Sequence, residues 1–207
     1  PSRDLAERMA RFGFVEPSHT ELPLLRPPQM EPSTPTAGSS VPVRFLFASS
    51  IIPSKGVDRL VSCFERISED ATLTLAGHAP PFDGHPGFGA SIRTRAMALP
   101  NVTWVGAVEP EAIPQLMRKH DVLVLPSIWP ENSPLVVREA TAYGLRIIGP
   151  RLGGCSELAP DATLVETEAE LLAALVAECQ KRQPRATPRS WPSPQEHASV
   201  LLRTAYR

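Results

Sequence analysis

The sequence predicts an α/β fold in which six parallel strands form one doubly wound sheet covered by helices on both faces. Between residues 43 and 182, short apolar runs of strand length alternate with amphipathic segments of helical length. The runs are almost continuously apolar, which is typical of parallel strands buried on both faces. With 207 residues the chain can bury one good core, and a second domain of full size would not fit.

The elements follow each other in a regular strand–helix rhythm, with Gly- and Pro-rich loops between them. Apolar runs predict strands at 43–48, 72–76, 102–105, 122–125, 146–148 and 163–165. Apolar residues at helical spacing predict helices at 57–67, 90–99, 110–119, 134–143 and 168–182. The run at 122–125 is the most apolar of the strands. Helices between consecutive parallel strands are the crossovers that such a sheet requires.

The two ends of the chain predict helices outside this unit. Residues 1–16 contain a helix at 2–12, which Gly13 ends, and residues 17–42 form a Pro/Ser/Thr-rich linker. Residues 183–207 comprise a proline-broken connector and a closing helix, leaving 43–182 as the main domain. Because both end helices carry apolar residues and have little core of their own, we expect them to pack on a second domain or partner chain.

Composition and charge exclude several classes of protein. The formal net charge of −1 and the scattered arginines give no basic surface for nucleic acid. No apolar run approaches the roughly 20 residues of a transmembrane helix. The odd set of Cys63, Cys155 and Cys179 lies among apolar residues and predicts reduced core thiols, as in a cytoplasmic protein.

Two carboxylates mark the most informative stretch, SIWPENSPLVVREATAYG at 127–144. Glu131 lies in the loop after the strand at 122–125, and Glu139 lies in the next helix. Ser133 and Pro134 predict the N-cap and first residue of that helix. Free N–H groups there suit an anion, and carboxylates accept hydrogen bonds from vicinal hydroxyls. This combination favours a nucleotide sugar, although two solvated glutamates on an ordinary helix remain an alternative for this segment alone.

The loop after the first strand, FASSIIPSKGVDRL, supplies a cation. Lys55 and Gly56 stand at a helix entrance, where a lysine can meet a phosphate beside free N–H groups. A solvated surface lysine is the alternative. The spacings of a P-loop and of a GxGxxG dinucleotide loop are absent.

Other loops offer weaker signals. His78 and His85 lie in a glycine- and proline-rich loop, which we expect to close over a ligand rather than to hold a metal, because no third ligand has diagnostic spacing. The strand at 102–105 ends near the same edge, where its backbone could border a nucleobase. Gly153 and Gly154 permit close backbone approach or a positive φ, but this segment alone favours a plain turn between strand and helix. No Asp-x-Asp pair and no catalytic triad can be assembled from the sequence.

In this order, the segments resemble the C-terminal domain of glycosyltransferase family 4, the retaining two-domain GT-B enzymes. The resemblance covers about 43–207 and rests on the Lys55–Gly56 loop, LTLAGH, NVTWVG, DVLVLPS with the E-x7-E pair, and GGCSE. It implies a Rossmann-like GT-B half that binds a nucleotide-diphosphate sugar without metal or other cofactor. It also implies a missing N-terminal acceptor domain, on the same chain or on a partner.

The resemblance assigns roles to residues. Lys55 would contact the donor diphosphate, Glu139 the ribose, and Glu131 the sugar or the reaction centre as the catalytic residue. Gly56 of the same loop is a further donor-binding candidate. The remaining donor-binding candidates are Ser50, His78, Val102, Val105, Asn132, Ser133 and Leu135. The two carboxylates need not meet, because Glu131 precedes the helix. We expect them to hold different parts of one ligand.

The chain departs from the family at two of these positions. Ser50 stands where the family usually has an arginine paired with the lysine, and Pro134 replaces a common glycine. Two classes of function therefore stay open: the donor-binding half of a glycosyltransferase, or a degenerate member that acts as a binding or assembly module. A sugar-nucleotide epimerase or a phosphorylase of the same fold is a third hypothesis.

Overall fold

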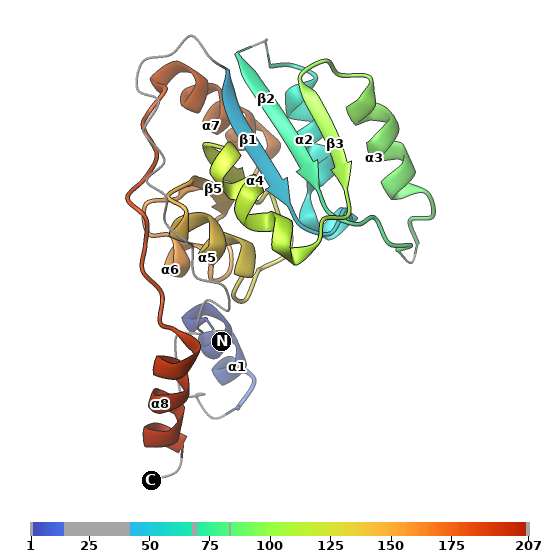
Figure 1. Cartoon of the computed structure of the whole chain (residues 1–207). Coiled ribbons are helices and arrows are strands. Elements are labelled where there is room, and N and C mark those ends of the chain that lie inside the picture. Colours follow the sequence, from blue (N-terminus) through green and yellow to red (C-terminus); the bar gives the residue numbers. More distant parts are fainter. Residues whose placement is uncertain (1, 15–41, 68–69, 83, 206–207) are drawn as a thin grey trace.

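The computed structural model describes residues 2–14, 42–67, 70–82 and 84–205, so nearly all of the predicted linker lies outside the described residues. Its centre is a six-stranded sheet in the order β3-β2-β1-β4-β5-β6, with every pair of neighbours parallel (Figure 1). The strands are β1 (Val43–Ala48), β2 (Ala71–Ala76), β3 (Val102–Gly106), β4 (Val122–Val124), β5 (Arg146–Pro150) and β6 (Thr163–Val165). The predicted doubly wound sheet is confirmed.

Helices cover both faces of the sheet. One face packs against α2 (Val57–Phe64), α3 (Phe88–Met97) and α7 (Glu168–Lys181). The other packs against α4 (Ile113–Lys119), α5 (Leu135–Ala142) and α6 (Cys155–Leu158). The remaining elements are α1 (Arg3–Arg11), α8 (Pro194–Ala205) and the short 3-10 helices η1 (Pro53–Lys55) and η2 (Pro110–Ala112).

Strand β1 lies in the middle of the sheet and shows why its run from Phe45 to Ala48 is continuously apolar. Phe45 and Phe47 point into the core with α2 and α7, while Leu46 points into the opposite core, and all three are fully buried. Phe45 meets Phe64 of α2 edge to face, with ring centroids 5.8 Å apart. When both faces of a strand are buried in cores, its residues cannot alternate between apolar and polar.

The predicted thiols lie in these cores. Cys63 and Cys155 are buried, Cys179 is half-buried, and all three are free. Burial raises the pKa of Cys63 to about 11 and the pKa of Cys155 to about 12. Thiols in such surroundings stay protonated and unreactive at neutral pH, in agreement with the prediction of inert core cysteines.

Several helical details differ from the sequence prediction. The segment predicted as a helix at 110–119 divides into η2 and α4, and α2 ends at Phe64 instead of residue 67. The helix predicted from Pro134 begins at Leu135, because the extended ψ of 112° at Pro134 places that proline at the N-cap. Ser133 is therefore not the cap, and its hydroxyl accepts a hydrogen bond from Arg138 instead, over 3.2 Å. The short helix α6 was not predicted, because four residues are too few to show a helical period.

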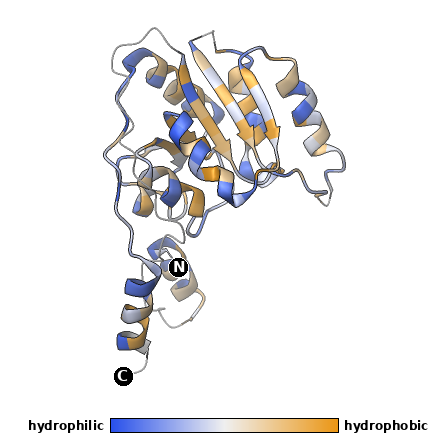
Figure 2. Ribbon diagram, viewed as in Figure 1, coloured by the Kyte–Doolittle hydropathy of each residue, from blue (hydrophilic) through white to orange (hydrophobic). Residues whose placement is uncertain are grey.

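The end helices project from one end of the sheet domain (Figure 1). Phe12 of the α1 C-cap is 81% exposed and Leu202 of α8 is 63% exposed. Figure 2 shows that α8 carries both hydrophobic and hydrophilic residues. Large exposed apolar side chains on both elements are the reason to expect a further domain or chain there, which stays a prediction.

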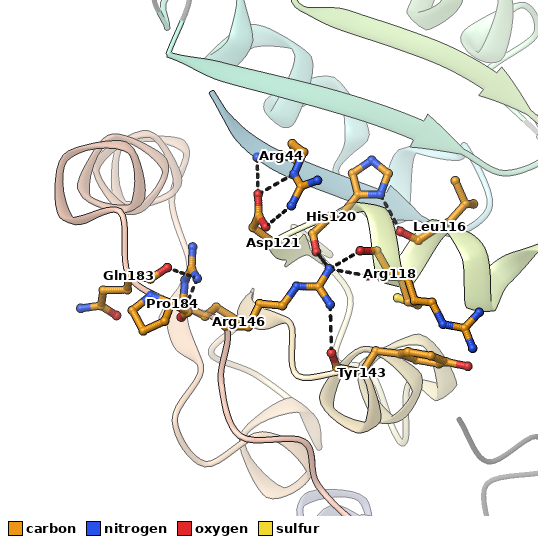
Figure 3. Close-up of polar contacts among 11 residues, drawn as sticks. Arg44, Leu116, Arg118, His120, Asp121, Tyr143, Arg146, Gln183 and Pro184 are labelled. Carbon is orange, nitrogen blue, oxygen red and sulfur yellow. Dashed lines mark hydrogen bonds and ion pairs between the residues drawn. The ribbon is translucent and has the colours of Figure 1, made fainter. Parts of the chain in front are cut away.

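The connector between α7 and α8 is tied to the domain by arginines. Arg185 donates to the backbone carbonyls of Met117, Arg118, His120 and Tyr143. Figure 3 shows the acceptors Arg118, His120 and Tyr143 together with the bidentate pair of Arg44 and Asp121 at the amino edge of the sheet. The segment is therefore an ordered strap, although its composition is that of a linker.

Candidate ligand-binding site

The candidate site lies where β1 and β4 are neighbours in the sheet. From this pair the strand order runs β1, β2, β3 in one direction and β4, β5, β6 in the other. The loops that leave the carboxyl ends of β1 and β4 therefore diverge, and such a switch point is the usual ligand crevice of an open parallel sheet. Lys55 comes from the first loop and Glu131 from the second.

The two loops are joined by their backbones. The Ile128 N–H donates to the Ser54 carbonyl over 3.0 Å. Gly56 has a φ of +64°, and a Cβ at this position would collide with the Pro126 carbonyl. Only glycine permits this approach, so Gly56 brings η1 against the end of β4.

Lys55 and Glu131 form the polar centre of the site. Lys55 Nζ lies 2.5 Å from Glu131 Oε1, and their side chains are 24% and 12% exposed. The Ser127 hydroxyl donates to the same carboxylate oxygen over 2.6 Å. With these contacts and a side chain that is mostly buried, Glu131 is not a solvated surface glutamate.

The backbone of Glu131 is held by the glycine pair after β5. Glu131 forms a parallel bridge with Gly153, and the Gly154 N–H donates to the Glu131 carbonyl over 2.7 Å. Gly153 has a φ of +90°, and a Cβ there would collide with the Glu131 backbone. The Gly153–Gly154 pair therefore serves a close backbone approach, and the plain turn that the segment alone favoured is not what the structure has.

The start of the chain reaches the same loop. Asn132 Oδ1 accepts hydrogen bonds from the backbone N–H and the hydroxyl of Ser2, over 2.8 and 3.1 Å. The Glu157 carboxylate accepts from the N–H groups of Arg3 and Asp4 at the start of α1. A carboxylate is favoured at a helix N-terminus by the helix dipole. The N-terminal end of α1 is thus hydrogen-bonded to the loop that carries Glu131.

The second predicted carboxylate, Glu139, does not share the contacts of Glu131. Glu139 lies half-buried within α5, whereas Glu131 turns toward Lys55 and Ser127. Leu135 begins α5 and is 58% exposed. The structure thus gives the two glutamates different surroundings.

The remaining predicted residues divide into two groups. Ser50 and His78 line one pocket of about 340 Å³ at the carboxyl ends of β1 and β2, and Val105 is exposed near the end of β3. Val102 is not brought to this edge. It begins β3 opposite Leu73 and is buried in the core. The side chain at the start of a parallel strand lies a full strand away from a carboxyl-edge site.

Sequence reasoning missed Ser127. It follows a buried proline at the end of β4, and the only signal was its place four residues before Glu131. Across the described residues, no three His, Cys, Asp or Glu side chains gather as metal ligands. In the same part of the chain, no helix is long and apolar enough to cross a membrane.

Comparison with known proteins identifies the family of this domain. Residues 42–181 match the family described as Glycosyl transferases group 1, which is well over half of the chain. The chain belongs to the glycosyl transferases group 1 family. No curated protein matches it in sequence.

Solved structures share the fold of this group 1 domain. HepE of Anabaena in complex with UDP superposes with a TM-score of 0.60 at 23% identity, over 69% of this chain and 40% of HepE. The C-terminal domain of LpcC, a group 1 transferase of Francisella tularensis, gives 0.58 at 19% identity, over 81% of this chain and 88% of that domain. The group 1 domain described here thus has the Rossmann-like fold of a GT-B C-terminal half, and it spans 40% of HepE.

Proposed function

We propose that this chain is the donor-binding half of a retaining glycosyltransferase, which transfers a sugar from a nucleoside diphosphate sugar to an acceptor. One observation carries the proposal: Lys55 and Glu131 meet at the switch point of the sheet, with Glu139 on the helix that follows. This supports the proposal, because a lysine can pair with a diphosphate and carboxylates can accept hydrogen bonds from sugar hydroxyls.

Each residue has a task that its chemistry suits. Lys55 is a compact cation at a helix entrance and would pair with the diphosphate. Glu139 would accept hydrogen bonds from the two ribose hydroxyls, and Glu131 would accept them from the sugar or stabilise positive charge at its anomeric carbon. Gly56, Asn132, Ser133 and Leu135 would contact diphosphate and sugar, while Ser50, His78 and Val105 would line the nucleotide side.

The reaction needs no general base on this half. In retaining transfer the leaving phosphate would take the acceptor proton, so the domain contributes binding and charge stabilisation. We propose that the donor is bound without metal or further cofactor, and that an N-terminal domain or partner chain supplies the acceptor. The three free thiols support a cytoplasmic setting for this proposal.

The comparisons support the choice of ligand. HepE was solved with UDP, with UDP and glucose, and with UDP-glucose, and each complex shares the fold of this chain. The sucrose-phosphate synthase of Thermosynechococcus elongatus also shares it, with a TM-score of 0.58 at 22% identity. A uridine nucleotide is accordingly the first ligand to test.

A degenerate binding module is the second candidate, and Ser50 favours it. Ser50 lines the same pocket as His78 and carries no charge where the family usually has an arginine paired with the lysine. A diphosphate held by Lys55 alone lacks one charged hydrogen bond, worth roughly 1.5–3 kcal/mol. An epimerase or phosphorylase of the same fold would bind a related ligand and is distinguished by its products.

Calorimetry on the 207-residue chain decides between transferase half and module. UDP, GDP and ADP, each with and without an attached sugar, are titrated into wild type, Lys55→Ala and Lys119→Ala. Lys119 is an exposed lysine at the end of α4 and serves as the matched control. We expect one nucleotide to bind, with an affinity that Lys55→Ala lowers at least about tenfold and Lys119→Ala leaves unchanged. The donor-site proposal fails if no nucleotide binds at millimolar concentration.

A further inference from the structure

The C-terminal strap, defined here as residues 182–193, also contacts α5, the helix that follows the loop carrying Glu131. Its half-buried Trp191 packs against the core that contains α5. The indole Nε1–H donates to the Thr141 hydroxyl over 3.2 Å. The backbone N–H of Arg189 donates to the Thr141 carbonyl over 2.9 Å. The strap is therefore joined to the same helix that carries Glu139.

Two arginine guanidinium groups also lie against the Trp191 ring. The guanidinium carbon of Arg138 lies 4.7 Å from the centre of the indole ring, and that of Arg189 lies 4.2 Å from it. Both distances are within the range of a cation–π contact, which strengthens when the cation is removed from water. Arg138 is only 4% exposed, so it depends strongly on such neighbours.

Arg138 in turn reaches the loop of the site. Its Nη2 donates to the Ser133 hydroxyl over 3.2 Å, and Ser133 lies between Glu131 and the first residue of α5. The path from the strap to the loop thus has two steps, from the indole ring to a buried guanidinium and from there to a serine hydroxyl. Glu139 is the next residue after Arg138.

We propose that Trp191 is a positioning residue for the donor loop: it orients Arg138, which holds Ser133 and thereby the loop segment 131–135. The proposal rests on the donor-binding function of that loop. It gives the strap a role in the site, since the ring comes from a segment more than 50 residues further along the chain. Without the ring, the buried guanidinium would move toward water and release Ser133.

Two variants of the tryptophan separate the ring from its N–H group. Trp191→Leu removes the π face but keeps an apolar side chain, whereas Trp191→Phe keeps an aromatic face and loses the donor to Thr141. Arg185→Ala is the matched control in the same strap, because Arg185 donates to backbone carbonyls at the amino edge of the sheet and, among the described residues, makes no hydrogen bond to Arg138, Ser133 or Trp191. Melting temperatures of all variants show how much stability each change removes.

The first measurement needs no ligand. Backbone order parameters of residues 131–135 are obtained by nitrogen relaxation for wild type and each variant of the 207-residue chain. We expect values near 0.85 in wild type, in Trp191→Phe and in Arg185→Ala, and values near 0.6 in Trp191→Leu. The ring-current shift of the Arg138 side-chain protons should disappear only in Trp191→Leu. Unchanged order in Trp191→Leu, or an equal loss in Arg185→Ala, would overturn the proposal.

The second measurement is UDP affinity by calorimetry. We expect Trp191→Leu to weaken UDP binding about three- to tenfold, Trp191→Phe to restore most of it, and Arg185→Ala to leave it unchanged. Equal affinities in wild type and Trp191→Leu would overturn the positioning role. If wild type itself binds no nucleotide, the proposed function fails, and the order parameters still decide whether Trp191 positions the loop.

Discussion

Lys55 Nζ and Glu131 Oε1 lie 2.5 Å apart, in a pair that joins the loop after β1 to the loop after β4. The cation proposed for the diphosphate is therefore already bound to a carboxylate of the same site. An incoming diphosphate must compete with Glu131 for Lys55. A sugar on that diphosphate would compensate, because its hydroxyls can donate to the carboxylate that the lysine leaves.

We predict that Glu131→Gln tightens UDP binding about tenfold, because Lys55 no longer has a charged competitor. The same variant should lose most of any preference for UDP-glucose over UDP. Calorimetry with both ligands measures the two effects. Glu109→Gln, at an exposed glutamate that precedes η2, is the control and should bind as wild type does. Weaker binding of UDP to Glu131→Gln would contradict the competition.

A second cation should strengthen the site. Ser50 lines a pocket of about 340 Å³, which leaves room for a longer side chain. We predict that Ser50→Arg raises UDP affinity about ten- to a hundredfold, the range of one added charged hydrogen bond. Ser50→Gln, which adds length without charge, should change the affinity little. Identical affinities for the two variants would show that the diphosphate does not lie beside Ser50.

The glycine that supports Glu131 should tolerate no side chain. Gly153→Ala must adopt a φ of +90° and place a Cβ against the Glu131 backbone. We predict a loss of about 2–5 kcal/mol in the free energy of unfolding, from the left-handed backbone and the overpacking together. Gly87→Ala is the matched control, because Gly87 has a φ of +82° and open space around it. Denaturant unfolding should show a loss of only about 1–2 kcal/mol for Gly87→Ala, the cost of the backbone alone. Equal losses of unfolding free energy in the two variants would contradict the close approach of Gly153 to the Glu131 backbone.

Stability should decrease as the pH falls below about 6.5 because of His120. Its Nδ1–H donates to the Leu116 carbonyl, its Nε2 accepts from the Thr74 hydroxyl, and burial lowers its pKa. Between the unfolded pKa near 6.5 and the lower folded value, only the unfolded chain takes up a proton, so unfolding becomes easier. The charged groups that face His120, namely Arg44, Asp121 and Arg185, keep their charges in this window.

The melting temperature from pH 8 to pH 5 measures this effect. His120→Asn should be less stable than wild type at pH 8 and should show a flatter decline. His78→Asn, at an exposed histidine, should retain the slope of wild type. Asp121 affects the stability only at lower pH. Burial raises its pKa, but hydrogen bonds from Arg44 outweigh this and hold the pKa below its usual value, so its contribution is lost only below about pH 3.8.

The fold was predictable because its signals are local. Strand β4 is apolar at every position and α2 repeats apolar residues on one face, so each pattern can be recognised within its own segment. The positions of Lys55 and Glu131 after their strands predicted that both would reach the same edge of the sheet. Boundaries were less certain, as Pro134 shows. A proline fits both the N-cap and the first helical residue, and only its ψ distinguishes them.

The contacts of the site were not predictable in the same way. The partners Lys55 and Glu131 are separated by 76 residues, and Trp191 and Thr141 by 50. No periodicity connects positions that far apart. Val102 was placed at the wrong end of its strand for a different reason. The carboxyl end of β3 lies at the edge of the candidate site, but Val102 is the first residue of β3 and its side chain is buried in the core.

By itself, therefore, the sequence determined the order of strands and helices along the chain and the two-faced core, and it predicted the edge at which a ligand would bind. Hydrophobic period and turn chemistry depend on neighbouring residues, and they are sufficient for that much. Only the tertiary structure decided that Glu131 binds Lys55, that Gly153 supports its backbone and that Trp191 lies against Arg138. Each of these contacts joins segments that meet only when the sheet has formed, because its energy depends on distance in space and not along the chain.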